Sequence, residues 1–522
     1  MLTHSPASAA RDSGIPILIA VCLAALVLPL SFSGGAIATP AIAVDLGGSP
    51  LALNWITNAF MLSFGSSLMA AGALADAFGR KRLFTIGITA FALVSLACWW
   101  APSIVWLDVL RAVQGIAAAA TLSGGSAALA QCFEGKARTR AFSFLGTSFG
   151  VGLAIGPILA GLLVARYGWR SVFLSGAIIG VLVLLFGVPR MKESRDPHAG
   201  KLDWPGTLTF TAMLTALTWG VLQAPESGWL SAPVIALLAG SASFLIAFII
   251  VEQRAHRPML DLSLFRYPRF VGVQVLPMAT CYCYVVLLVL LPLRFIGIEG
   301  RSETDAGLAM IALSAPMLVM PSLAASLTRW FSPGAISGIG LLIAAGGLFL
   351  LSQTPHGATL AMIVIGLGTG LPWGLMDGLS VSVVPKERAG MATGIFSTTR
   401  VAGEGIALAI VSTLLAVLTQ ARLSRLMPGS GSPIPEAARH LAMGDMGRAL
   451  ALLPEANPPL LADVYAGAFQ VLMYLLIAIT LVSALIVFGV LREKEKVTPS
   501  SSTQGCLAGS QLSQSQRSSS HV

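Results

Sequence analysis

Apolar runs long enough to cross a bilayer recur along almost the whole chain, from Ile17 to Val490. A membrane helix needs roughly 20 such residues, because the hydrocarbon core is about 30 Å thick. The chain is 55% hydrophobic and only 11% charged, with a mean hydropathy of +0.82, whereas soluble domains contain about 25% charged residues. Each run is apolar on both faces, which excludes the alternating pattern of a membrane β-barrel. The sequence therefore predicts an all-α polytopic membrane protein.

Loop residues divide the apolar runs into fourteen predicted spans. The spans lie near residues 15–40, 53–75, 83–101, 103–130, 141–165, 171–189, 205–224, 231–251, 270–292, 305–328, 334–352, 358–384, 389–418 and 466–490. With the N-terminus inside, 22 of the 32 Lys and Arg residues fall in cytoplasmic segments and eight fall outside. Because this bias follows the positive-inside rule, we expect a multi-pass protein of the cell inner membrane with both termini in the cytoplasm.

Three segments lie outside the predicted spans. Residues 1–14 are predicted to form a cytoplasmic N-terminus, and residues 419–465 the one long external loop, in which residues 436–453 are compatible with a helix. Residues 491–522 are rich in Ser and Gln and have no apolar period. Such a composition predicts a disordered cytoplasmic tail.

Several classes of function are excluded by what the sequence lacks. The net charge of +9 is explained by the basic cytoplasmic loops, so it does not indicate nucleic acid binding. The six cysteines fall mostly inside apolar runs without the spacing of zinc ligands, so no metal site is expected. Gly135-Lys136 lacks the earlier glycine of a phosphate-binding Walker A loop. We therefore expect no cofactor and no enzymatic activity such as ATP hydrolysis.

A charged turn is predicted between spans 2 and 3, where one acid stands among bases. The chain reads Gly72-Ala-Leu-Ala-Asp76-Ala-Phe-Gly79-Arg80-Lys81-Arg82. Glycine permits a tight turn, and Asp76 can accept helix N-terminal amides or pair with a neighbouring base. The segment, through Gly72, Asp76, Gly79, Arg80 and Arg82, is a candidate conformational latch. The alternative is an ordinary charged turn with a solvated acid.

Spans 4 and 5 contain two further patterns. Span 4 reads Leu110-Arg111-Ala-Val-Gln114-Gly115, and span 5 has glycine at positions 146, 150, 152, 156 and 161. Small residues at such intervals let helix backbones approach closely, and Pro157 removes one helical hydrogen bond, which favours a bend. For Gly152, Gly156, Pro157 and Gly161 the alternative is helix packing without a functional role.

In this order and in these spans, the three patterns resemble the signatures of the major facilitator superfamily. Gly168-Trp169-Arg170 before span 6 and Asp203-Trp204-Pro205-Gly206 at the start of span 7 are similar to its fourteen-helix drug:proton antiporter family. The resemblance implies two six-helix bundles, residues 15–189 and 270–490, flanking a cavity. Residues 190–269 would link the bundles through the inserted spans 7 and 8. It also implies alternating access by rocking of the bundles about a site near the membrane midplane.

Charged residues within spans are the candidates for proton coupling, because a charge at the bilayer centre costs about 2.5–3.5 kcal/mol and needs a partner or water. Asp108 and Arg111 lie one turn apart and form either a neutralising pair or, as the resemblance implies, a group in which Arg111 controls proton occupancy. Asp377 and Arg400 are predicted at similar depths, with Glu404 one turn deeper. Arg400 and Glu404 form either a structural pair or a titrating site whose pKa changes with cavity hydration.

The chain departs from the family pattern at some of these positions. Where the first span of the family has an acid and an asparagine, this chain has Ser31 and Ala36. Span 13 has Glu404 where a small residue is common in the family. One interpretation is that the titratable acid has moved from the N-terminal to the C-terminal bundle; the other is that proton coupling has been lost.

These features predict a secondary transporter that exports amphipathic small molecules in exchange for protons. The candidates to line a loosely specific apolar cavity are Phe32, Trp55, Tyr282, Tyr284, Trp373 and Met376. The expected partners are a small-molecule substrate, protons and the lipid bilayer, with no nucleic acid; the sequence does not indicate whether accessory export proteins take part. Two alternatives stay open: an uncoupled facilitator or exporter of one specific metabolite, and a non-transporting membrane sensor or scaffold.

Overall fold

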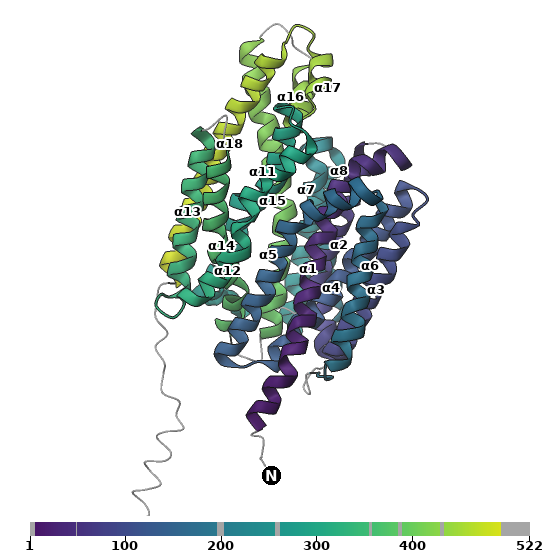
Figure 1. Ribbon diagram of the computed structural model, residues 1–522, viewed down its shortest axis with the longest axis vertical. Helices are drawn as coiled ribbons and strands as arrows, with labels where there is room; N and C mark the ends of the chain where they lie inside the picture. Colours follow the sequence, from purple (N-terminus) through teal and green to yellow (C-terminus); the bar gives the residue numbers. More distant parts are fainter. Residues whose placement is uncertain are drawn as a thin grey trace, which may run out of the picture. The chain divides into compact units, whose positions relative to one another are not determined.

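A computed structural model describes residues 6–47, 50–195, 203–255, 262–353, 358–384, 389–427 and 433–491. All regular structure in these residues is helical, as predicted (Figure 1). The first part consists of α1 (Pro6–Leu46), α2 (Pro50–Phe78), α3 (Arg80–Trp99), α4 (Ile104–Cys132), α5 (Gly135–Tyr167), α6 (Arg170–Leu182), η1 (Val183–Gly187), η2 (Val188–Arg190), α7 (Trp204–Ser227) and α8 (Ala232–Arg254). The second part consists of η3 (Leu262–Arg266), α9 (Pro268–Thr280), η4 (Cys281–Val285), α10 (Val286–Leu293), η5 (Arg294–Ile298), α11 (Glu303–Ser314), α12 (Pro316–Leu327), α13 (Pro333–Gln353), α14 (Thr359–Ser382), α15 (Ala389–Leu426), α16 (Ile434–Ala442), α17 (Met446–Leu452) and α18 (Pro458–Leu491).

Thirteen helical stretches of the described chain are long and apolar enough to cross a membrane. Three of them, Arg170–Arg190, Pro268–Ile298 and Asp305–Leu327, join several shorter helical segments. The remaining predicted span, residues 205–224, corresponds to α7, a helix of 24 residues that is not among the thirteen. Threonine recurs along α7, from Thr207 to Thr218, and its hydroxyl groups make this helix less apolar than the others.

Helix contacts divide most of the described chain into two bundles. In the first, α2 packs on α4, α1 on α5, and α3 on α4 and α6. In the second, α13 packs on α14 and α18, while α9 contacts α14, α15 and α18. The main contacts between the bundles are made by α2 with α15 and by α5 with α12 and α14. The two inserted helices pack on each other, and α7 also contacts both α2 and α15, so it lies along the junction of the bundles.

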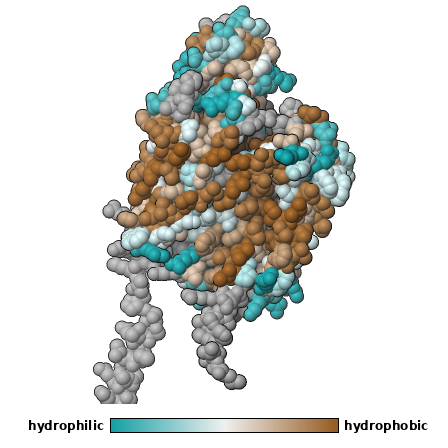
Figure 2. All heavy atoms as spheres, in the orientation of Figure 1, coloured by the Kyte–Doolittle hydropathy of each residue, from teal (hydrophilic) through white to brown (hydrophobic). Residues whose placement is uncertain are grey.

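The helix ends define two opposite sides of the molecule. We call the side that holds Gly79, Glu134 and Val384 the basic side, and the opposite side, with Gly168 and Gly228, the far side. Figure 2 shows apolar residues gathered over the middle of the helices and hydrophilic residues gathered towards the two sides. This distribution is the one that a bilayer requires.

The predicted external loop 419–465 is shorter than expected, because α15 continues to Leu426 and α18 begins at Pro458. The predicted helix at 436–453 is instead two short helices, α16 and α17, which lie at the far side (Figure 1). Gly444 separates them with a φ of +81°, a backbone conformation that favours glycine. The carbonyl oxygen of Gly444 lies so close to Gly297 that a Cβ atom at Gly297 would collide with this oxygen. The loop is therefore packed against the bundle through glycine.

Candidate functional site

The bundles meet on the basic side, where α5 contacts α14. A Cβ atom at Gly146 would collide with the carboxylate of Asp377, and one at Gly150 would lie 2.8 Å from the indole nitrogen of Trp373. Trp373 Nε1 donates a hydrogen bond to the carbonyl of Gly146 at 3.1 Å. Two glycines of α5 thus allow α14 to approach closely, and the bundles are closed against each other at this point.

Next to this contact lies a buried ion pair that joins α14 to α15. Arg400 Nη1 donates to both carboxylate oxygens of Asp377, at 3.1 Å and 2.9 Å. The two side chains are only 2% and 4% exposed, and the guanidinium carbon lies 4.4 Å from the ring centre of Phe149 on α5. Because a buried charge without a partner is costly, each member of the pair holds the other in place.

Glu404 does not take part in this pair. The sequence left open a structural pair between Arg400 and Glu404, but the structure pairs Arg400 with Asp377 instead. Glu404 is 4% exposed, and its Oε1 atom is buried without a hydrogen-bond partner. Glu404 lies one turn along α15 from Arg400, where its side chain lines a different space.

That space is a cavity of about 90 Å³ between the bundles in the far-side half, which we call the central cavity. Its walls come from α1, α2 and α5 of the first bundle and from η4, α10, α11 and α15 of the second. They include Phe32, Met61, Leu153, Pro157, Val285, Pro292, Met310 and Glu404. Glu404 is the one ionisable side chain among the residues that line it. The wall is otherwise almost entirely apolar.

Arg111 forms a second buried polar group, inside the first bundle. Its Nε donates to the carbonyl of Ile56 at 2.8 Å, and its Nη1 donates to Gln114 Oε1 at 2.6 Å and to Ser31 Oγ at 3.1 Å. The guanidinium carbon lies 4.4 Å from the ring centre of Phe60, while Nη2 is buried without a hydrogen-bond partner. Ser31, which stands where the family has an acid, therefore contacts this arginine as a neutral hydroxyl.

Asp108 and Arg111 do not form the neutralising pair that their spacing allows. The hydrogen bonds of Arg111 go to Ile56, Gln114 and Ser31, and the Oδ1 atom of Asp108 is buried without a partner. The direct contacts of the arginine are thus with neutral acceptors and aromatic rings.

The latch segment is divided between a helix and a turn. Gly72 and Asp76 lie within α2, and only Gly79, with a φ of +113°, forms the turn. Asp76 Oδ1 accepts a hydrogen bond from Arg80 Nη2 at 2.8 Å. Asp76 also borders a small cavity of about 10 Å³ together with Ser126 of α4 and Thr393 of α15. This acid therefore lies at the junction of the bundles on the basic side.

The N-terminus of α3 is bound by an acid that the sequence did not single out. The carboxylate of Glu193 accepts hydrogen bonds from the backbone amides of Lys81 and Arg82, each at 3.2 Å. The backbone amide of Arg80 donates to the carbonyl of Ser194 at 2.9 Å. Asp76 was a candidate for this capping role, but Glu193 fills it from 112 residues away in the chain. Local spacing holds no signal for such a contact.

The Gly168-Trp169-Arg170 triplet anchors the far-side end of α1. Trp169 Nε1 donates to Asp45 Oδ2 at 3.0 Å, and Arg170 forms an ion pair with the same carboxylate. The hydrogen bond from Trp169 and then that from Arg170 lower the pKa of Asp45. All three residues belong to the first bundle, so this pair does not cross the junction.

The glycines of span 5 contact two neighbouring helices, α14 and α1. A Cβ at Gly152 would collide with the carbonyl of Leu26, and one at Gly156 with the hydroxyl of Ser33, so both glycines face α1. Pro157 lies inside α5 and lines the central cavity. A Cβ at Gly161 would meet no neighbouring atom within 4 Å, and the predicted ridge of close contacts therefore ends at Gly156.

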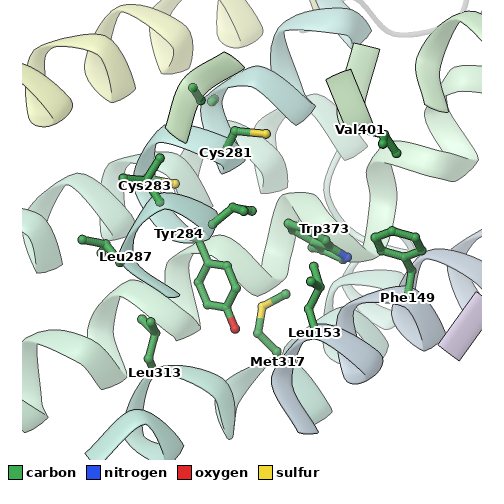
Figure 3. Close-up of a cluster of buried hydrophobic side chains, with 14 of the residues drawn as sticks. Phe149, Leu153, Cys281, Cys283, Tyr284, Leu287, Leu313, Met317, Trp373 and Val401 are labelled. Atoms are coloured by element: carbon green, nitrogen blue, oxygen red, sulfur yellow. The ribbon is translucent and has the colours of Figure 1, made fainter. Parts of the chain in front are cut away.

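Of the six aromatic and methionine candidates for the cavity wall, only Phe32 lines the central cavity. Tyr284, Trp373 and Met376 are fully buried in the helix core, and the rings of Tyr284 and Trp373 lie 6.1 Å apart (Figure 3). Trp55 packs edge-on against Trp219 of α7, and Tyr282 lines a separate cavity beside α7. Because these helices are apolar on every face, the sequence pattern could not distinguish a core position from a cavity wall.

Comparisons with known proteins agree with this arrangement. Residues 21–408 match the model of the family described as Major Facilitator Superfamily. The chain is 31% identical over 413 residues to the multidrug resistance protein Stp of Mycobacterium tuberculosis, covering 78% of this chain and 75% of that protein. It is 32% identical over 470 residues to the cephamycin export protein CmcT of Amycolatopsis lactamdurans, covering 87% of this chain and 94% of that protein. It is 28% identical over 483 residues to the tetracenomycin C resistance and export protein of Streptomyces glaucescens, covering 90% and 89%.

Solved structures share the fold at low sequence identity. The human organic anion transporter MFSD10 superposes with a TM-score of 0.57 at 13% identity, covering 89% of this chain and 99% of that one. The proton:xylose symporter XylE superposes with a TM-score of 0.56 at 16% identity, covering 84% and 96%. These likenesses show that the chain shares their arrangement of helices.

Proposed function

Because the chain belongs to the major facilitator superfamily, we propose that it exports amphipathic small molecules in exchange for protons, by alternating access. The relatives named for multidrug resistance and antibiotic export support the choice of export over uptake. Alternating access needs a cavity that is closed from one side of the membrane at a time. The contact of α5 with α14 on the basic side and the central cavity in the far-side half fit one such state.

The position of Glu404 is the observation that most supports proton coupling. Among the described residues that form the wall of the central cavity, it is the one ionisable side chain, and its Oε1 has no hydrogen-bond partner. A proton can therefore bind to or leave Glu404 without breaking an ion pair, since Arg400 is held by Asp377. In the proposed cycle, substrate and proton occupy this cavity in alternation. The apolar remainder of the wall suits amphipathic substrates.

Proton release on substrate binding is the test of this function. The detergent-solubilised protein, in weakly buffered solution, should release protons when a panel of amphipathic dyes is added, and liposomes containing it should transport the same dyes in response to an imposed pH gradient. Binding without proton release, together with transport that ignores the gradient, would support an uncoupled exporter instead. The neutral Ser31 beside Arg111 is the observation that favours that second candidate.

We propose that Asp76 stabilises the state closed on the basic side. Asp76→Asn should lower export several-fold, leave the protein folded and inserted, and shift the population towards the basic-side-open state. The reason is that Asp76 lies at the junction of α2, α4 and α15, and its charge is favoured near the N-terminal turns of α15. Ser126→Cys, at a buried position on this junction, should then become reactive towards a membrane-impermeant maleimide.

Asp45→Asn is the matched control, because it also removes an acid from a partly exposed Asp–Arg pair, but within the first bundle. In the Asp45→Asn protein, the labelling of Ser126→Cys should equal its labelling in a protein that carries Ser126→Cys alone. The same reaction tests the orientation that we propose, with the basic side and both termini cytoplasmic at the inner membrane. Labelling should occur in inside-out vesicles; labelling confined to right-side-out vesicles would reverse the orientation, and unchanged labelling and export would refute the latch.

A further inference from the structure

A second cavity, distinct from the central cavity, lies beside α7. It has a volume of about 310 Å³ and is bounded by α2, α7, η3, α9, η4 and α15; we call it the α7 cavity. Its wall includes Met69, Phe210, Met213, Met278, Tyr282 and Thr398. The volume is within the range of about 300–1,000 Å³ that small-molecule sites have. The wall reaches the molecular surface at Phe265, which is 44% exposed.

Thr398 gives this cavity an unused hydrogen-bonding group. The residue is 94% buried, since only 6% of it is exposed, and its Oγ1 has no hydrogen-bond partner. Two other threonines of α15 show what the ordinary arrangement is. Thr413 and Thr419 donate to the carbonyls four residues earlier, at 2.9 Å and 2.7 Å. A buried hydroxyl left without a partner costs roughly 1–3 kcal/mol, which a ligand could recover.

The chemistry of the wall defines the class of ligand. No Asp, Glu, Lys, Arg or His is among the described residues that line the α7 cavity, so a charged molecule would lose its hydration without gaining an opposite charge. Methionine and aromatic side chains instead suit flat or flexible apolar molecules. Gly403 makes room for Met278 in this wall, because a Cβ at Gly403 would collide with the terminal methyl of Met278.

We propose that the α7 cavity binds a neutral, largely apolar small molecule that carries one hydrogen-bond acceptor, which receives the hydroxyl of Thr398. The ligand would reach the cavity from the bilayer along α7, which exposes Leu208 and Trp219 at the molecular surface. The α7 cavity is separate from the central cavity, since Gly403 lines the α7 cavity whereas Glu404 lines the central cavity. The proposal concerns binding and does not depend on the direction or the coupling of transport.

Benzophenone is a suitable probe, because it is neutral, has a single carbonyl acceptor, and on irradiation inserts into nearby C–H bonds. The full-length protein in lipid nanodiscs is irradiated with increasing benzophenone, and modified residues are identified by mass spectrometry. Modification of Met213 and Met278 should saturate, whereas modification of the lipid-facing Leu245 and Ile246 of α8 should rise linearly. The charged analogue 4-benzoylbenzoate should modify the two methionines weakly or not at all.

Thr398→Val and Thr399→Val form a matched pair, since both residues line the α7 cavity and valine keeps the volume of threonine. Thr398→Val should raise the half-saturating concentration of benzophenone about fivefold, the factor expected for the loss of one net hydrogen bond. Thr399→Val should leave that concentration unchanged. Linear modification of Met213 and Met278, or equal effects of the two substitutions, would overturn the proposal. Thr398→Val should melt at or above the wild-type temperature, because it removes a buried hydroxyl without a partner, and Thr399→Val should melt at the wild-type temperature. These melting temperatures separate lost binding from lost folding.

Discussion

Glu404→Gln is expected to abolish transport driven by a pH gradient while the protein still binds and exchanges substrate. Glutamine keeps the size and polarity of the side chain but cannot release a proton. Flux in liposomes with an imposed pH gradient should fall to the uncoupled background, about tenfold or more below the wild type. Counterflow of the same dye without a gradient should stay within about twofold of the wild type, because it needs no net proton movement.

This substitution is informative, because replacing Glu404 leaves no buried charge without a partner. Arg400 is already neutralised by Asp377, so Glu404→Gln should leave the melting temperature nearly unchanged. Glu404→Asp, which keeps a carboxyl group one methylene shorter, is the control and should retain part of the gradient-driven flux. Full gradient-driven flux in Glu404→Gln would reject Glu404 as the proton carrier. It would leave Asp108 as the next candidate, since its Oδ1 also lacks a partner.

Asp377→Asn should have the largest effect on stability. It leaves Arg400, 2% exposed, as a buried cation without a carboxylate. Breaking a buried pair on one side costs about 3–5 kcal/mol. We therefore expect a marked fall in the melting temperature in detergent and in the amount of inserted protein. Asp76→Asn is the comparison, because its pair with Arg80 is partly exposed, and such pairs contribute only about 0–1 kcal/mol.

The double variant Asp377→Asn, Arg400→Gln separates the loss of an ion pair from the loss of packing. Removing both charges should restore most of the melting temperature that Asp377→Asn loses, since no unpaired charge is left. If the double variant is no more stable than Asp377→Asn, shape complementarity with Gly146 and Trp373, and not charge, explains the effect.

The fold could be predicted because each membrane helix must be apolar along its own length. That condition is local, so runs of residues predicted most spans. Helix ends were harder: α15 continues past residue 418 to Leu426, where Thr419 and Leu423 are fully buried. The π-helical segments η1, η4 and η5 were also not predicted. Of these, η4 and η5 follow Pro277 and Pro292, which interrupt the helical hydrogen bonds, but a proline alone does not specify the turn that results.

The charged site could be predicted only in part, for a geometric reason. Helical spacing indicated Glu404 as a neighbour of Arg400, and depth indicated Asp377 as another. The choice between them depends on which face of α15 meets α14, and that face depends on how α15 packs against α2, α7, α9 and α14 together, which no local pattern specifies. Glu193, which binds the N-terminus of α3, was missed for the same reason.

One helix, α15, presents a different side chain to each of three environments: Thr398 to the α7 cavity, Arg400 to Asp377, and Glu404 to the central cavity. A helix turns as a rigid body, so these three groups cannot be displaced independently. Thermodynamic linkage then imposes a reciprocity on them. If a molecule in the α7 cavity changes the proton affinity of Glu404 by some factor, protonation of Glu404 must change the affinity of that molecule by the same factor. A bilayer-borne ligand and the proton supply would in that case be two effectors that act through the same helix.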